Sequence, residues 1–180
     1  MGYPGKNKKT FDKPSHPWQG TRISAEAELV KSYGLKNKRE IWKAATTLRK
    51  YRRESRKLLF ETQELGERGE HAKIEREKFL SKLRKIGLIQ SDSTLDDVLT
   101  LKVEDVLERR LQTRVHKKGL ANSTKQSRQL IVHGHVAIGG RRVTVPSYAV
   151  PMGEEEIIEF YKRSPMYNNV PVESSKADKE

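Results

Sequence analysis

Apolar residues recur at helical spacing through the first half of the chain. A stripe with a seven-residue repeat is formed by Ile41, Leu48, Ser55 and Thr62, with Ala44, Ala45, Tyr51, Leu58, Leu59 and Leu65 between them. This spacing predicts a long amphipathic helix from about Asn37 to Leu65. Between Lys31 and Lys57 there are eleven Lys and Arg residues and only two acids. Because like charges repel along a helix, a polyanionic partner would stabilise this segment.

Shorter helices are predicted on both sides of the long one. Ser24 is a suitable N-cap for a helix that runs to Tyr33, after which Gly34 can end it. Another helix is expected at about Glu70 to Ile86, and acids alternate with bases along it. That alternation is typical of a solvent-exposed connector. The segment 93–99 has the sequence of a capped helical turn.

The stretch from 103 to 119 predicts a single helix with one apolar seam. Leu107, Leu111 and Val115 lie four residues apart on it, and Gly119 ends it. A cationic stripe is expected beside this seam, formed by Arg110, Arg114, Lys117 and Lys118. The stripe predicts that Arg110→Glu weakens binding to a polyanion.

A second helix is predicted from Ser123 to His133, ended by Gly134. Ser123 is its N-cap, and Gln126 completes a capping box. Leu130 and Ile131 would face the core that the two helices share. Three side chains can project outward from it: Lys125, Arg128 and His133. Free backbone N–H groups at its N-terminus suit a phosphate.

A β-hairpin is predicted directly after these helices. Residues 135–138 form one strand, a Gly-Gly pair tolerates the positive φ of a two-residue turn, and residues 141–145 return. Short extended segments are expected at 148–151 and 156–161. The predicted fold class is therefore α+β: a mostly helical N-terminal region followed by a C-terminal module of two helices packed on a small antiparallel sheet.

The pattern divides the chain into four parts. Residues 1–22 predict a basic extended arm, because Gly and Pro interrupt any regular structure. Residues 23–102 predict the helical region and residues 103–166 the compact module. Residues 167–180 predict a polar, disordered tail.

Charge adds a partner to this picture. Lys and Arg number 37 against 24 Asp and Glu, which gives a net charge of +13. Nucleic acid and an anionic membrane surface are the two candidates. No apolar run approaches the roughly 20 residues of a membrane-spanning helix, which favours nucleic acid. The chain has no Cys, which excludes disulfides and thiol chemistry.

The candidate RNA contacts are basic side chains with a few polar or aromatic ones. In the C-terminal module they are Arg109, Arg110, Arg114, Lys117, Lys118, Ser123, Lys125, Arg128, His133, Arg141 and Arg142. In the arm they are Lys6, Lys8, Lys9 and Trp18, and on the long helix Arg49, Arg52, Arg53 and Arg56. Arg binds phosphate oxygens in pairs and stacks on bases, so mostly phosphate contacts with a steep salt dependence are expected.

Other chemistries have less support. His133 and His135 lack a Cys, Asp or Glu at ligand spacing, so a polar or RNA contact is favoured over a metal. The Gly-Gly pair is not followed by the Gly-Lys-Ser/Thr of a phosphate-binding loop. The acids between 96 and 108 suit the first turns of helices, and no Ser, His and Asp are placed together. We expect no catalytic residue, metal or cofactor.

Short runs along the chain resemble one known family. In the C-terminal module they are Leu107-Glu108-Arg109-Arg110-Leu111-Gln112, Val115-His116-Lys117, Ala121, Ser123, Ser127-Arg128, Leu130-Ile131, Val132-His133-Gly134-His135-Val136 and Pro146-Ser147. Before it they are His16-Pro17-Trp18-Gln19, Arg22-Ile23, Tyr33-Gly34-Leu35, Asn37-Lys38 and Arg39-Glu40. Together they resemble small-subunit ribosomal protein S-four, in its archaeal and eukaryotic branch. Some bacterial members bind zinc through N-terminal cysteines, which this chain lacks.

The resemblance implies a function as well as a fold. It implies a cytoplasmic, non-enzymatic protein that binds small-subunit ribosomal RNA and nucleates assembly of the subunit body. It also implies ribosomal protein S-five as a neighbour, a position by the region where mRNA enters, and a contribution to translational accuracy. Two alternatives are an RNA-modifying enzyme that uses the same module as a handle and a ribosome-associated stress factor.

Overall fold

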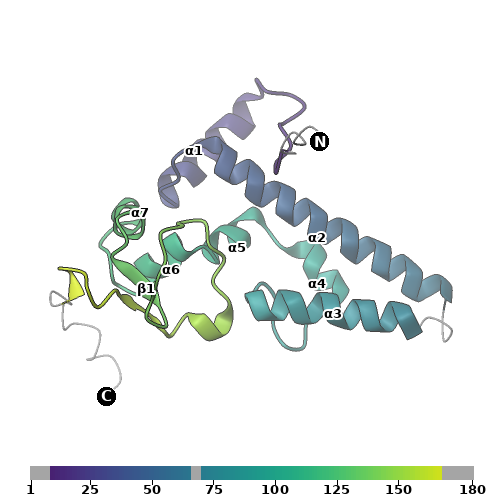
Figure 1. Ribbon diagram of the computed structural model, residues 1–180. Helices are drawn as coiled ribbons and strands as arrows, with labels where there is room; N and C mark the ends of the chain where they lie inside the picture. The colour runs from purple at the N-terminus through teal and green to yellow at the C-terminus, as the bar shows by residue number, and fades with distance from the viewer. Residues whose placement is uncertain (1–8, 66–69, 168–180) are drawn as a thin grey trace, which may run out of the picture.

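The computed structural model describes residues 9–65 and 70–167, and its helices and strands follow one another along a bent chain (Figure 1). The helices are α1 (Gly20–Ser32), α2 (Lys38–Leu65), α3 (Glu70–Ile86), α4 (Leu95–Thr100), α5 (Val103–Glu108), α6 (Leu111–Lys117) and α7 (Thr124–Val132). The strands are β1 (Val136–Ile138), β2 (Arg141–Arg142) and β3 (Ile158–Phe160), with the short 3-10 helix η2 (Met152–Glu154) before β3. The α+β class predicted from the sequence is confirmed.

The long helix α2 organises the N-terminal region, as its apolar stripe predicted. Figure 1 shows α3 and α4 running beneath it. Their shared core consists of Leu48, Leu58, Phe79, Leu80, Leu83, Ile89, Leu95, Val98 and Leu101. Ser55, a polar member of the stripe, is fully buried and donates a hydrogen bond to the Leu95 carbonyl at 2.7 Å. This bond ties α2 to the start of α4.

Two predictions for this region were wrong. Helix α1 begins at Gly20, inside the expected arm, and Ser24 lies within it and donates to the Thr21 carbonyl instead of capping the helix. Helix α3 is not a solvent-exposed connector, because Phe79, Leu80 and Leu83 are buried against α2. The alternating acids and bases of α3 lie on its outer face, and its buried apolar face packs the helix against α2.

The helix predicted over 103–119 is broken at Arg109 and Arg110. Arg110 has an extended backbone (φ −73, ψ 142) and is the N-cap residue of α6, and it pairs with Ala149 in an antiparallel bridge. Leu107 and Leu111 are both fully buried, but they enter different cores because the chain turns between them. The single seam and its cationic stripe are therefore wrong.

The second helix and the hairpin follow the prediction closely. The Gln126 N–H donates to the Ser123 hydroxyl at 3.2 Å, while the Gln126 side chain accepts from the Asn122 N–H. Both turn glycines have positive φ, and the sheet has the antiparallel order β2-β1-β3. The return strand is shorter than expected, since only Arg141 and Arg142 pair in it. These elements enclose the core formed by Leu111, Val115, Ala121, Leu130, Ile131, Val136, Ile138, Val150, Ile158 and Phe160.

The N-terminal region and the module meet at the turn between α1 and α2. Leu35, Ile41 and Ala44 pack against Leu107 in a third core. Gly34 has φ +58 and lies so close to α7 that a Cβ there would be 2.6 Å from the Thr124 hydroxyl oxygen. Only a residue without a side chain fits this backbone conformation and this spacing.

Candidate nucleic-acid interface

The exposed candidates of the module lie on α7 and on the hairpin beside it. Lys125 is exposed on α7, His133 is exposed as the C-cap residue of that helix, and Arg141 and Arg142 are exposed on β2. The stem of Arg142 covers Gly134, where a Cβ would be 2.9 Å from the Arg142 Cδ. This contact places Arg142 beside the C-terminal end of α7, next to the exposed His133. Ser123 is exposed at the other end of α7.

Lys117 and Lys118 are exposed but make contacts within the chain. Lys117 pairs with Glu108 at 2.9 Å. The Lys118 ammonium donates to the carbonyls of Glu155 and Glu156, which fastens the end of α6 to the loop before β3. Such exposed contacts are weak, and a phosphate could compete for either ammonium.

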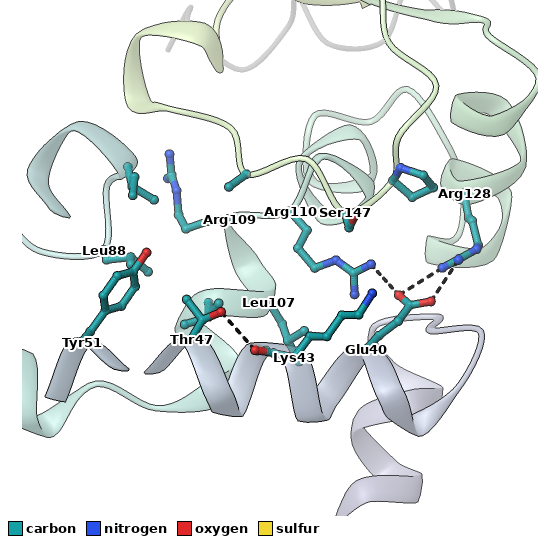
Figure 2. A pocket seen from close by; sticks show the side chains of 15 residues that line it. Glu40, Lys43, Thr47, Tyr51, Leu88, Leu107, Arg109, Arg110, Arg128 and Ser147 are labelled. Atoms are coloured by element: carbon teal, nitrogen blue, oxygen red, sulfur yellow. Dashed lines mark hydrogen bonds and ion pairs between the residues drawn. The ribbon is translucent and has the colours of Figure 1, made fainter. Parts of the chain in front are cut away.

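Arg110 and Arg128 instead converge on Glu40 of α2, as Figure 2 shows. The Arg110 Nη2 donates to Glu40 Oε2 at 2.5 Å, and the Arg128 Nη2 donates to Glu40 Oε1 at 3.0 Å. Arg110 is 8 % exposed, so it does not lie on the surface as the predicted stripe required. The substitution Arg110→Glu would set two carboxylates against each other and disturb the fold, so it cannot test RNA contact.

The two guanidinium groups change the acidity of Glu40. Burial by itself raises the pKa of this carboxyl, but the hydrogen bonds and charges of Arg128 and Arg110 together outweigh burial and lower the pKa below its ordinary value. A carboxyl whose pKa is lowered on folding stabilises the protein above the pKa of the unfolded chain. This contribution is lost as the pH falls through the lower pKa of the folded state.

We therefore predict that acid weakens the native chain partly through Glu40. Between about pH 5 and pH 3, the free energy of unfolding of the wild type should fall more steeply than that of Glu40→Gln, which has no proton to bind there. Urea unfolding at several pH values measures both curves. Parallel curves would contradict the role given to this carboxylate.

Arg109 and Arg114 form a second internal cluster around Glu155. Arg109 is buried, pairs with Glu155 and donates from Nη2 to the Val150 carbonyl at 2.8 Å. Arg114 is half-buried and lies 3.4 Å from the same carboxylate. Burial and then the Arg114 charge lower the pKa of Arg109, against the opposing effect of Glu155. The cluster fixes the loop that carries η2 against the start of α6.

Gln112 is a residue that the pattern did not single out for the site. It is 1 % exposed, and its amide nitrogen lies within hydrogen-bond distance of the carbonyls of Tyr33, Gly34 and Thr124. It therefore joins the α1–α2 turn to the start of α7. Glu40 was missed as well, although its signal was present: it is one of only two acids in a basic stretch.

The candidates on α2 differ in their surroundings. Arg53 and Arg56 are exposed, and Arg49 pairs with Asp12 at 3.0 Å. Arg52 is half-buried and donates to the Leu101 carbonyl. Arg53 and Arg56 are thus the two candidates on this helix without an ion pair or hydrogen bond to the described residues.

The arm candidates are only partly described. Lys6 and Lys8 lie outside the described residues, and Lys9 is exposed. Trp18 is 90 % exposed and precedes Gln19, the N-cap residue of α1. Arg22 holds this turn by donating to the carbonyls of His16 and Pro17. An aromatic ring left open to solvent on a braced turn is suited to stacking on a base.

Two further features, metal sites and membrane-spanning helices, were sought in the described residues. Among residues 9–65 and 70–167, no cluster of His, Cys, Asp or Glu has the grouping of a metal site. Within the same residues, no helix is both long and apolar enough to cross a membrane.

The helices α6 and α7, their cap and the hairpin define an RNA-binding module of the S4 type. The S4 domain family matches residues 109–156, inside the module predicted from the sequence. Two relatives, both described as small ribosomal subunit protein uS4, extend the likeness over nearly the whole chain. The protein of Methanococcoides burtonii is 51 % identical over 166 residues, covering 92 % of this chain and 90 % of the relative. That of Methanothermobacter thermautotrophicus is 49 % identical over 170 residues, covering 94 % of this chain and 96 % of the relative.

The chain therefore belongs to the small ribosomal subunit protein uS4 family, in its archaeal branch. The resemblance found in the sequence is confirmed. The matches in the N-terminal half matter here, because the S4 domain alone occurs in proteins of several functions.

Proposed function

We propose that this chain is a structural protein of the small ribosomal subunit that binds small-subunit rRNA directly, and that it is not an enzyme. The observation that carries the proposal is the set of exposed cations that the compact module holds on α7 and β2. Lys125, Arg141 and Arg142 are exposed there and form no ion pair with the described residues. An excess of positive charge held on a rigid module is the usual electrostatic footprint of an RNA-binding protein.

The finer parts of the function follow from family membership. We propose that the protein acts in the cytoplasm, nucleates assembly of the subunit body and contributes to translational accuracy. Its neighbours would be ribosomal protein S-five and the region where mRNA enters. We also propose residues 103–166 as the RNA-binding domain, residues 23–102 as a helical region that supports it, and the arm 1–22 and tail 167–180 as extensions.

The candidate RNA contacts separate into two groups on this proposal. The exposed side chains would reach the RNA directly: Lys9, Trp18, Arg49, Arg53, Arg56, Lys117, Lys118, Ser123, Lys125, His133, Arg141 and Arg142. Arg109, Arg114, Arg128 and Arg52 would instead hold the fold that presents them, because each is buried or half-buried and contacts another part of the chain. Arg110 also holds the fold through Glu40, but it lines the cleft between α2 and the module, and its Nε has no acceptor among the described residues. Lys6 and Lys8 stay candidates of the arm.

Binding to small-subunit rRNA at several salt concentrations tests the proposal. The triple variant Lys125→Gln, Arg141→Gln, Arg142→Gln should bind roughly 10- to 100-fold more weakly, and its salt dependence should be shallower by about two to three phosphate contacts. The physical reason is that each cation that binds a phosphate displaces about one counterion from the RNA, so a variant with fewer cations releases fewer counterions when it binds.

The matched control is a triple variant on α3: Lys73→Gln, Lys78→Gln and Lys82→Gln, all exposed. It removes the same charge from a surface where acids alternate with bases, so it should bind within about threefold of the wild type. Equal losses in the two variants would contradict a localised surface. Retention in salt-washed small subunits at one copy each separates a structural protein from a transient stress factor.

A further inference from the structure

A cleft of about 480 Å³ lies between α2 and the module, where Figure 2 views it from close by. Helix α2 forms one wall with Glu40, Lys43 and Thr47, and the loop with Pro146 and Ser147 forms the opposite rim. Arg110 lies between these walls, and Arg128 closes the end toward α7. The cleft therefore exists only because the two regions of the chain pack together.

The charges around this cleft do not cancel. Four cations line it, namely Lys43, Arg109, Arg110 and Arg128, and Glu40 is the one acid among the lining residues. Arg109 is compensated from outside the cleft by Glu155. Glu40 is the single carboxylate against the remaining three cations, and it pairs with Arg110 and Arg128 but not with Lys43, which leaves about two positive charges in the cleft. Such a place concentrates anions.

Two hydrogen-bond donors in the cleft, on Arg110 and Lys43, have no acceptor among the described residues. The Nε of Arg110 is shielded from solvent and has no acceptor among the described residues. A buried donor without an acceptor costs free energy, so an incoming acceptor that reaches it after a small turn of the guanidinium is favoured. The side chain of Lys43 extends toward Glu40 and Arg110, and its ammonium has no ion pair or hydrogen bond among the described residues. The dashed line at Lys43 in Figure 2 is a bond to its backbone carbonyl, which accepts from the Thr47 hydroxyl at 3.0 Å. The Lys43 ammonium can therefore donate to the same bound anion as Arg110.

We propose that this cleft binds one phosphate group of the RNA backbone, held by Lys43 and Arg110 in competition with Glu40. The phosphate would supply the missing acceptor of Arg110 and neutralise the excess charge, while Arg128 stays with Glu40. The inference rests on the proposed function, because it takes RNA as the source of the phosphate. It makes the junction of the two regions part of the binding site, so RNA would bind more tightly when the regions are packed together.

The test compares two lysines of α2. Lys43→Gln removes the cleft cation, and Lys50→Gln removes an exposed cation two helical turns further along, outside the cleft. Both substitutions are at exposed positions, so both variants should fold. For rRNA, Lys43→Gln should lose about tenfold in affinity and Lys50→Gln less than about threefold.

Inorganic phosphate is the second probe. At matched ionic strength, replacing chloride by phosphate should raise the melting temperature of the wild type and of Lys50→Gln by a few degrees, and that of Lys43→Gln hardly at all. Equal behaviour of the two variants toward rRNA would overturn the cleft site while leaving RNA binding itself intact. A phosphate effect lost in Lys43→Gln without any difference for rRNA would mean a site for free phosphate, which also contradicts the proposal. If the wild type did not bind rRNA, the proposed function itself would be contradicted.

Discussion

Glu40→Ala should lower the free energy of unfolding by about 3 kcal/mol, because removal of one partner leaves a buried charge uncompensated. Glu40 is the only carboxylate within ion-pair distance of Arg110 and Arg128 in the described chain. Its loss leaves Arg110 buried and without a counterion, and the junction between α2 and the module loses its polar link. Urea or thermal unfolding followed by circular dichroism measures the change.

Glu54→Ala is the matched control for this prediction. Glu54 is exposed on the same helix and forms no ion pair with the described residues. Its replacement should change the free energy of unfolding by less than about 0.5 kcal/mol. A loss of under about 1 kcal/mol for Glu40→Ala, close to that of the control, would show that water or a mobile side chain compensates the two arginines.

Gly34→Ala should destabilise the chain by about 3 kcal/mol, from two separate causes. Residue 34 has φ +58, a conformation that costs an L residue about 1–2 kcal/mol. The new Cβ would also lie 2.6 Å from the Thr124 hydroxyl oxygen and 3.0 Å from the Thr124 carbonyl carbon, so α7 must shift. Such overpacking costs typically about 1–3 kcal/mol.

Gly119→Ala separates these two causes. Gly119 has φ +78, but a Cβ at this position would have no neighbouring atom within 4 Å. Only the conformational cost applies there, so the loss should be about 1–2 kcal/mol. The difference between the two variants measures the contact between the α1–α2 turn and α7. If both variants lost the same free energy, the close approach of Gly34 to Thr124 would have no energetic weight.

The elements of this protein were largely predictable because their signals are local. The repeat through Ile41, Leu48 and Ser55 sets one buried face on α2, whatever packs against it. Ser123 and the Gly-Gly turn act within a few residues of themselves, through a cap hydrogen bond and positive φ. The family, too, could be recognised from short runs of residues, and the comparison with known proteins confirmed it.

The places of the charged residues were not predictable in the same way. Arg110 and Arg128 have the same side chain as Arg53 and Arg56, yet the first pair is held by a carboxylate that precedes it by 70 and 88 residues. No periodicity signals such a pairing, since it exists only once α2 packs on the module.

By itself, therefore, the sequence determined most of the helices and turns, the excess of positive charge and the family. The tertiary structure alone decided which cations join the two regions and which remain exposed. The physical reason is that helix caps, turns and buried faces depend on neighbours along the chain, whereas the state of a charge depends on whatever folding brings beside it.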